Sequence, residues 1–320
     1  MIKRLAIVVP CYNEEEALPD TDKVLNDLMK DLVKREIVKS NSFILYVNDG
    51  SKDKTWNVIK NAYENSEYVH GLNLAGNKGH QNALLAGLMQ VKDEVDVTIS
   101  IDADLQDDVG VIEEMVEKYY SGCDIVYGVR NDRTSDSGFK KFTAEAFYKL
   151  MNYMGAKTVY NSADFRLMSN RALDELSLYS ETHLFLRGLA PELGFKTDCV
   201  YYKRSPRLKG ESKYPLKKML SFAFNGVTSF SDKPLTLILY LGFIAILIAI
   251  IAVIYSLVQH ANGHTIQGWT SLFASIWFIG GVQLVCLGVI GQYVGKTFIE
   301  TKKRPRYYIE SYLTHEKNKE

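Results

Sequence analysis

Apolar and polar positions follow two alternating patterns from residue 5 to residue 203. Short apolar runs rich in β-branched residues predict buried strands, and longer segments with apolar residues at helical spacing predict helices. The predicted strands are 5–9, 43–47, 69–74, 95–101, 124–128, 161–168 and 197–203. One predicted helix opens at 11–16, with acids in its first turn, another begins near Thr55, and another ends at Val91. Three more cover 109–120, 139–154 and 183–193, and one follows a cap at Ser169 or Asn170.

This alternation predicts an α/β fold with a doubly wound, mainly parallel sheet and right-handed crossovers. The carboxyl ends of parallel strands meet at one edge of such a sheet, and ligands bind at that edge. We therefore expect the polar residues that follow the predicted strands to share one site.

The pattern changes at Pro234. From Pro234 to Gly295 the chain has no Asp, Glu, Lys or Arg, and the segments 235–258 and 270–294 are each long enough to cross a bilayer as helices. Basic residues flank both segments, which predicts that both termini and the globular domain are cytoplasmic. The segment 215–230 has one apolar face, which is typical of an interfacial helix. We therefore expect a multi-pass protein of the cell (inner or plasma) membrane.

The expected organisation is a cytosolic domain at 1–213, an interfacial amphipathic helix at 214–233, a transmembrane hairpin at 234–296 and a cytosolic tail at 297–320. Glycines along the second span allow close helix packing within the hairpin or between protomers, and we expect a homo-oligomer. Neither span carries an acidic or basic residue that would mark an ion path, so packing is favoured over a pore.

Composition adds few constraints. The chain has 320 residues and a formal net charge of +0, so its overall charge does not favour a nucleic acid as a partner. The apolar run at 5–9 is too brief for a signal peptide. The cysteines Cys11, Cys123, Cys199 and Cys286 have no metal-type spacing, and we expect reduced thiols.

The strongest candidate site follows the strand at 95–101. Asp102 and Asp104 lie one residue apart at its carboxyl end, where two carboxylates can share a divalent cation that also holds a diphosphate. An isolated Asp-x-Asp is more often a turn before a helix. Other polar groups at the same predicted edge favour the metal-bound nucleotide.

These other groups follow the neighbouring strands. Tyr12 and Glu14 come after the first strand and Asp49 after the second, while Lys78 precedes a helix whose exposed amides suit a phosphate. His80 alone is more typical of a surface or packing histidine than of a catalyst.

Charged residues also follow the later strands. Asp164 and Arg166 point to the same face if their segment is extended, and a structural salt bridge is an alternative to a catalytic role. Arg130 and Arg133 follow the fifth strand. The basic loop at 204–214 is a solvated segment or a contact for phosphates at headgroup depth.

With these motifs in place, the chain resembles family 2 glycosyltransferases of the GT-A fold, and most closely the polyprenyl-phosphate type. That type includes the bactoprenol glucosyltransferases and, more distantly, the dolichol-phosphate mannose synthases. The resemblance runs from Val9-Pro10-Cys11-Tyr12-Asn13-Glu14-Glu15 to Lys302-Lys303-Arg304-Pro305, beyond the second span. The Gln-x-x-Arg-Trp motif of processive members is absent from the sequence, which argues against a polysaccharide synthase.

The resemblance implies a set of residue roles. Nucleotide-binding residues would be Pro10, Tyr12, Glu14, Asp49, Lys78, Asp102 and Arg130. Mg²⁺ or Mn²⁺ would lie on Asp102, Asp104 and Gln106. The acceptor phosphate would contact Arg133, Arg204, Arg207, Ser212 and Lys213. The candidate catalytic residues are Asp104, Asp164 and Arg166.

The expected reaction is inverting transfer of a sugar, glucose by resemblance, from a UDP-sugar to polyprenyl (undecaprenyl) phosphate. The lipid-linked sugar would serve cell-envelope glycan modification. GlcNAc, galactose or a GDP-sugar donor are alternatives, as are a nucleotide-sugar hydrolase, a flippase role for the hairpin and a non-catalytic membrane scaffold. A phosphate nucleophile is largely dianionic near neutral pH, so we expect Asp164 to position groups rather than act as a base.

Overall fold

The protein is described here from a computed structural model. The described residues are 2–131, 159, 161–181, 186–204, 268–315 and individual positions between 235 and 258. The predicted helix at 139–154, the interfacial helix at 214–233 and the candidate site residues Arg133, Arg207, Ser212 and Lys213 lie outside this part.

The chain divides into two compact units. The first comprises Met1–Lys218 and Pro305–Glu320, and the second comprises Met219–Arg304. Two segments far apart in the sequence therefore build the first unit.

One sheet organises the first unit, and its described residues form eight strands in the order β7-β5-β6-β4-β1-β2-β3-β8. The strands are β1 (Leu5–Cys11), β2 (Phe43–Asn48), β3 (Val69–Leu74), β4 (Val97–Ser100), β5 (Ile125–Arg130), β6 (Ser162–Ser169), β7 (Thr197–Tyr202) and β8 (Ile309–Leu313). Strands β4, β1, β2 and β3 run parallel, as β5 and β7 do, while β6 is antiparallel to β4 and β5 and β8 is antiparallel to β3. The predicted α/β fold with a mainly parallel sheet is confirmed.

Helices connect and cover these strands. They are α1 (Leu18–Lys34), α2 (Thr55–Asn65), α3 (His80–Val91), the 3-10 turn η1 (Val109–Val111), α4 (Ile112–Tyr120), α6 (Asn170–Ser177) and α7 (Leu186–Glu192). The hydroxyl of Ser169 accepts a hydrogen bond from the Ala172 amide at 3.1 Å, so it caps α6 as the sequence predicts. The helix after β1 begins at Leu18, so the acidic residues Glu14 to Glu16 lie in the turn before it.

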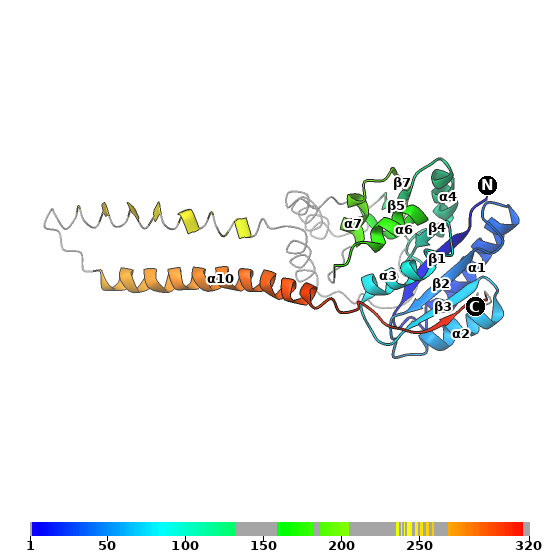
Figure 1. Cartoon of the computed structure of the whole chain (residues 1–320), viewed down its shortest axis with the longest axis horizontal. Helices are drawn as coiled ribbons and strands as arrows, with labels where there is room; N and C mark the ends of the chain where they lie inside the picture. The colour runs from blue at the N-terminus through cyan, green and yellow to red at the C-terminus, as the bar shows by residue number, and fades with distance from the viewer. Residues whose placement is uncertain are drawn as a thin grey trace. The chain divides into compact units, whose positions relative to one another are not determined.

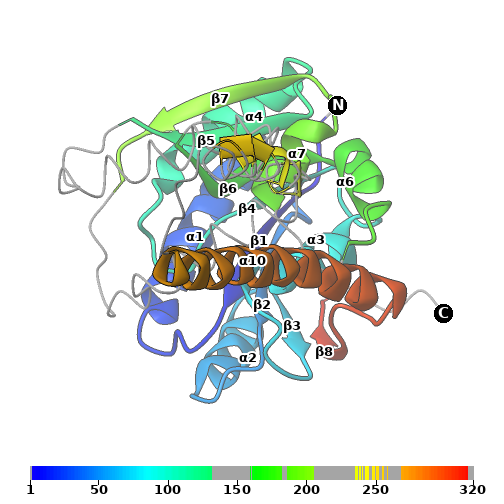
Figure 2. The same ribbon diagram turned by 90° about the vertical axis from the view of Figure 1, so that its left-hand side faces the viewer.

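The two faces of the sheet are covered by different helices. Buried side chains of α1, α2 and α4 share one apolar cluster with Leu5, Ile7 and Val9 of β1. On the other face, α3 approaches so closely that a Cβ at Gly87 would lie 2.5 Å from Val8. Figure 2 shows α1 and α3 on opposite sides of β1 and β2. A doubly wound core of this kind leaves only the ends of the strands for polar chemistry.

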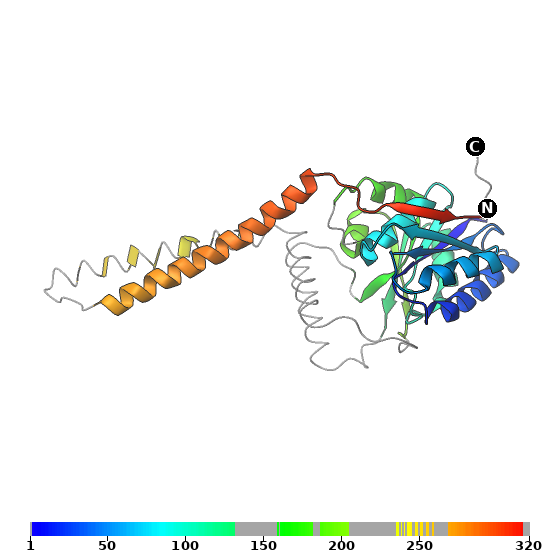
Figure 3. The ribbon, with the colours of Figure 1, turned by 90° about the horizontal axis from the view of Figure 1, so that it is seen from below.

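Strand β8 was not predicted from the sequence. It follows the long helix α10 (Trp269–Thr301) in the chain and pairs with β3 at the edge of the sheet. Figure 3 shows this strand, in red, lying along the sheet edge. The register aligns Asn73 with Ser311, which brings a late part of the chain beside a strand that precedes the candidate site.

In the second unit, α10 is the one described helix that is long and apolar enough to cross a membrane, over Phe278–Thr301 (Figure 1). The described positions from Leu235 to Val258 are helical, but they are separated by gaps. The helix α10 extends beyond the predicted end at Val294.

Candidate active site

Four loops at the carboxyl ends of the parallel strands each contain a residue with a positive φ. These residues are Asn13 after β1 (54°), Gly50 after β2 (60°), Gly79 after β3 (85°) and Leu105 after β4 (51°). Left-handed backbone is unfavourable for a residue with a side chain, and for Leu105 the cost is on the order of 1 kcal/mol. Sharp turns at four adjacent strand ends shape this edge of the sheet.

Asp49 joins two of these loops. Its carboxylate accepts hydrogen bonds from the amides of Lys78 (2.7 Å) and Gly79 (2.9 Å), and its own amide donates to the carbonyl of Cys11. Burial raises the pKa of the Asp49 carboxyl, and the two amides oppose this effect. Because Asp49 is buried and each of its carboxylate oxygens accepts an amide, this side chain holds the loops together.

The acidic stretch after β4 is fixed by its neighbours. The Thr21 hydroxyl donates to the carbonyl of Ala103 at 2.6 Å, and Asp104 accepts from the amide of Gln106 at 3.2 Å. The Asp102 side chain is 32% exposed. Burial raises the pKa of the Asp102 carboxyl, and the charges of Asp164, Asp107 and Asp104 add to this although His80 opposes it. A cation would relieve the crowding of these negative charges.

Asp164 lies beside this stretch because β6 is antiparallel to β4. The register pairs Ser100 with Arg166, so the amino end of β6 meets the carboxyl end of β4. The hydroxyl of Ser100 donates to the carbonyl of Asp164 at 2.5 Å. The structure thus brings Asp102 and Asp164 to one place from opposite strand directions.

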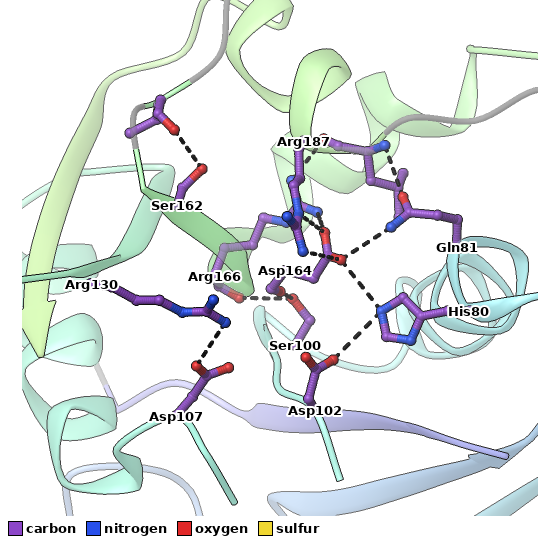
Figure 4. A network of polar contacts seen from close by, with 12 residues as sticks. His80, Gln81, Ser100, Asp102, Asp107, Arg130, Ser162, Asp164, Arg166 and Arg187 are labelled. Carbon is purple, nitrogen blue, oxygen red and sulfur yellow. Dashed lines mark hydrogen bonds and ion pairs between the residues drawn. The ribbon is translucent and has the colours of Figure 1, made fainter. Parts of the chain in front are cut away.

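Four side chains surround the buried carboxylate of Asp164 (Figure 4). Its partners are Arg166 at 3.1 Å, Arg187 at 3.2 and 3.1 Å, Gln81 at 3.1 Å and His80 at 3.4 Å. Burial alone would raise the pKa of the Asp164 carboxyl, but Arg187, His80 and Arg166 hold it well below its usual range. The carboxylate therefore stays ionised.

His80 links this cluster to the acidic stretch. Its Nε2 lies 3.4 Å from Asp164 and 3.5 Å from Asp102. Burial opposes a charge on the ring, but the two carboxylates outweigh it and raise the pKa of His80. The sequence alone favoured a surface or packing role, whereas the structure places His80 in the site.

Basic side chains flank the other end of the acidic stretch. Arg130 lies 3.3 Å from Asp107, which also accepts a hydrogen bond from the Tyr202 hydroxyl at 2.6 Å. Arg204 donates to the side-chain carbonyl of Gln106. Two guanidinium groups therefore lie next to the Asp102–Asp107 stretch, where a phosphate would be attracted.

The remaining predicted residues occupy the neighbouring loops. Pro10 is buried in β1, Tyr12 is 37% exposed and Glu14 donates its amide to the Thr55 hydroxyl at 2.9 Å. The exposed Lys78 lies 5.7 Å from the centre of the Tyr308 ring. These residues belong to the loops at the strand-end edge.

Sequence reasoning missed Arg187, Gln81, Asp107 and Tyr202. Arg187 had one local signal, since it is a basic residue in an otherwise apolar short segment, Phe185-Leu186-Arg187-Gly188-Leu189. Gln81 and His80 open α3 directly after a glycine turn, a position that faces the strand-end edge. Arg187, Gln81 and His80 converge on Asp164 because of the placement of β6, which local patterns do not specify.

The residues present fit a divalent cation delivered with a diphosphate. No group of three His, Cys, Asp or Glu side chains arranged to hold a metal occurs among the described residues. Mg²⁺ is commonly held by one or two protein carboxylates together with substrate phosphates. The half-open Asp102 and the neighbouring Asp104 supply two such carboxylates.

Comparisons with known proteins identify the family of the chain. Residues 6–177 match the model of the family "Glycosyl transferase family 2". The chain is 51% identical over 98% of its length to the uncharacterized glycosyltransferase YkoT of Bacillus subtilis (strain 168), and covers 93% of that protein. It is 38% identical to a prophage bactoprenol glucosyl transferase homolog of Escherichia coli (strain K12), covering 96% of this chain and 98% of that protein. The same identity is found with the bactoprenol glucosyl transferase of Shigella phage SfX, over 96% of this chain and 99% of that protein.

The resemblance read from the motifs is thereby confirmed at the level of the family. The matched residues include most of β1, the acidic stretch after β4 and the Asp164 segment. The chain belongs to glycosyl transferase family 2.

Proposed function

We propose that this chain is a membrane-bound inverting glycosyltransferase that moves glucose from UDP-glucose to a polyprenyl phosphate. The observation that carries the proposal is the meeting of three features at one sheet edge. These are the Asp102–Asp104 pair, the Asp164 cluster and the arginines Arg130 and Arg204. The similarity to bactoprenol glucosyl transferases over nearly the whole chain supports a polyprenyl phosphate, such as undecaprenyl phosphate, as the acceptor.

The donor would lie along the strand-end loops. Pro10, Tyr12, Glu14 and Asp49 would hold the base and ribose, with Lys78 near the phosphates. A Mg²⁺ or Mn²⁺ ion on Asp102, Asp104 and Gln106 would neutralise charge on the diphosphate as it leaves. Arg130 would share this role, because guanidinium groups bind phosphate oxygens with charge-assisted hydrogen bonds.

The acceptor phosphate would approach beside Arg204, with Arg133, Arg207, Ser212 and Lys213 as further contacts. A phosphate oxygen attacks the anomeric carbon, and the bond between that carbon and the diphosphate breaks with its electron pair moving to the leaving group. Attack from the opposite face inverts the configuration. The guanidinium of Arg204 stabilises negative charge without a proton transfer.

Asp164 would position groups in this reaction. Its oxygens are engaged by Arg166, Arg187, Gln81 and His80, and its pKa is held well below the ordinary value. A carboxylate in this state is a poor proton acceptor at neutral pH. A phosphate nucleophile has little need for a base, so the geometry and the chemistry are consistent.

We further propose a cytoplasmic catalytic domain and a two-helix hairpin in the cell membrane. One described helix, Phe278–Thr301, supports this topology, and the uncharged stretch from Pro234 to Gly295 supports a second span. The lipid-linked product would then form at the cytoplasmic surface, for use in cell-envelope glycans.

The test is an assay with purified full-length protein in detergent. Radiolabelled UDP-glucose, UDP-GlcNAc, UDP-galactose and a GDP-sugar are each offered with a polyprenyl phosphate, with and without EDTA. We expect a lipid-linked product from UDP-glucose that EDTA abolishes and Mg²⁺ or Mn²⁺ restores. The control variant is Asp108→Asn, because Asp108 is exposed and caps η1 outside the site.

The outcomes separate the alternatives. Absence of a lipid-linked product from every donor would contradict the transferase, and release of free sugar without the lipid would favour a hydrolase. Product formation that is unaffected by Asp102→Asn and Asp104→Asn would remove the proposed metal site.

A further inference from the structure

Hydrogen bonds between side chains of the sheet connect strand β8 to the loops of the candidate donor site. We propose that Glu310, on β8, is a positioning residue for the loop that carries Asp49. This inference rests on the proposed function, because it takes the site at Asp49 to bind a nucleotide-sugar donor.

A continuous series of hydrogen bonds leads from Glu310 to this loop. Asn73 donates from Nδ2 to Glu310 at 2.6 Å, and Asn48 donates from Nδ2 to Asn73 Oδ1 at 2.7 Å. Asn48 Oδ1 then accepts the amide of Ser51 at 3.3 Å, across the turn that contains Gly50. Each amide side chain thus accepts on one side and donates on the other.

The next contact carries the series to a second loop. The hydroxyl of Ser51 accepts the amide of Asn13 at 3.0 Å, and Asn13 accepts the amide of Lys52 at 2.9 Å. The loops after β1 and β2 are therefore held by the same side chains. These loops contain the proposed base-binding residues Tyr12, Glu14 and Asp49.

The strand also contacts the loop after β3. The carbonyl preceding β8, at Tyr308, accepts the amide of Ala75 at 2.9 Å, and Lys78 lies over the Tyr308 ring. Asp49 accepts the amides of Lys78 and Gly79 in that same loop. Both loops that meet at Asp49 thus depend on contacts with the C-terminal segment.

Burial and charge give the series its effect. Glu310 is exposed, whereas Asn48 is 3% exposed and Asn73 is 8% exposed, so water has little access to the two amides inside the series. A hydrogen bond to an ionised carboxylate is stronger than one between neutral groups, and hydrogen bonds in a series polarise one another. Glu310 therefore orients both amides in the direction that leaves Asn48 Oδ1 facing the Ser51 amide.

If the role of Glu310 were purely structural, its only effect would be to dock β8 onto β3. Tyr312 provides the matched control, because its hydroxyl donates to Glu94 at 3.3 Å and lies on the same strand, outside the series. Tyr312→Phe weakens docking of the strand but leaves the series to Asn48 intact. Glu310→Gln retains an acceptor oxygen and is the conservative variant.

The first measurement is amide hydrogen exchange of full-length protein in detergent without nucleotide. Glu310→Ala should speed exchange in peptides covering 48–52 and 75–79, while Glu310→Gln restores most of the protection and Tyr312→Phe leaves it unchanged. The second measurement is UDP binding in the presence of Mg²⁺, where we expect Glu310→Ala to weaken the affinity about three- to tenfold. The thermal unfolding midpoints of Glu310→Ala and Tyr312→Phe should both lie below that of the wild type, while Glu310→Gln stays close to it.

Three results would overturn the proposal. They are unchanged exchange in Glu310→Ala, equal effects of Glu310→Ala and Tyr312→Phe on the loops, or unchanged UDP affinity in Glu310→Ala when the wild type binds UDP. Failure of the wild type to bind UDP contradicts the proposed function instead, and the exchange measurement then still decides whether Glu310 orders the loops.

Discussion

The guanidinium of Arg187 donates two hydrogen bonds to the carboxylate of Asp164, at 3.2 Å and 3.1 Å. The two residues come from different elements, α7 and β6. The Asp164 side chain is 5% exposed, and Arg187 is 35% exposed. A buried carboxylate is thus oriented by an arginine that extends to the surface of the site.

Replacing Arg187 should lower turnover more than donor affinity. Charge-assisted hydrogen bonds contribute about 1.5–3 kcal/mol each, so Arg187→Met should reduce kcat by roughly tenfold to a hundredfold. The affinity for UDP, measured by calorimetry, should change less than about twofold, since the proposed base and ribose contacts lie on other loops. Arg171→Met is the control, because Arg171 is 69% exposed and pairs with Asp124 elsewhere. An unchanged kcat in Arg187→Met would contradict a positioning role for this pair.

The pH dependence of transfer should distinguish positioning from base catalysis at Asp164. The wild-type carboxyl has a pKa well below its ordinary value, so it is ionised throughout the neutral range and gives kcat no acidic limb there. Asp164→Asn should retain UDP binding and lose transfer, with no steep recovery between about pH 6 and pH 9. Steep recovery of the variant at high pH would instead indicate that Asp164 acts as a base.

The positions of the strand-end residues could be predicted from the sequence because they depend on local patterns. The runs that form β1 and β2 are almost wholly apolar, those that form β3 and β4 mix apolar with small or polar residues, and the polar residues after all four mark the edge of the sheet. Asp164 and Arg166 were also expected on one face, and they form an ion pair at 3.1 Å.

The contacts that complete the site could not be predicted in the same way. Insertion of β6 between β4 and β5 pairs Ser100 with Arg166, residues far apart in the sequence. Strand β8 has only five residues, Ile309–Leu313, and these are mostly exposed or half-buried at the sheet edge. Such a strand has no strong apolar alternation, because none of its side chains is fully buried on either face of the sheet.

Gly50 should be indispensable for the loop that holds Asp49. Its φ is +60°, and a Cβ there would lie 2.5 Å from the amide nitrogen of Asn77 and the carbonyl carbon of Gly76. Gly50→Ala combines a left-handed alanine with a backbone clash, so we expect a loss of at least ~2 kcal/mol in the free energy of unfolding. Thermal unfolding should shift down by about 4–8 °C, and the donor KM should rise.

Gly76→Ala is the matched control for this loop. A Cβ at Gly76 would have no atom within 4 Å, so this variant should unfold near the wild-type temperature. Equal midpoints for Gly50→Ala and the wild type would show that the loop relaxes without cost, contrary to the expected strain.

His70 should make the sheet edge sensitive to acid. The ring is 3% exposed, stacks on Phe43 at 4.1 Å and faces Tyr312 of β8, and its Nδ1 has no hydrogen-bond partner within the described part of the chain. Burial, helped by nearby His315 and Arg4, lowers the pKa of His70 to about 3. The unfolded chain, with an ordinary histidine, therefore binds the proton more readily than the folded chain does.

The sign of the effect follows from this difference. Above the unfolded pKa, about 6.5, His70 is neutral in both states and its stabilising contribution is fully present. As the pH falls from about 6.5 toward 3, the unfolded state gains a proton that the folded state excludes, and stability decreases. By pH 5 the loss from this residue should be on the order of 2 kcal/mol.

His70→Phe preserves an aromatic ring against Phe43 and removes the titration. Chemical denaturation of both proteins in detergent at pH 8 and pH 5 should therefore show a smaller acid-dependent loss in the variant. Parallel losses in the two proteins would mean that His70 accepts its proton in the folded state, which the packing of its ring between Phe43 and β8 argues against.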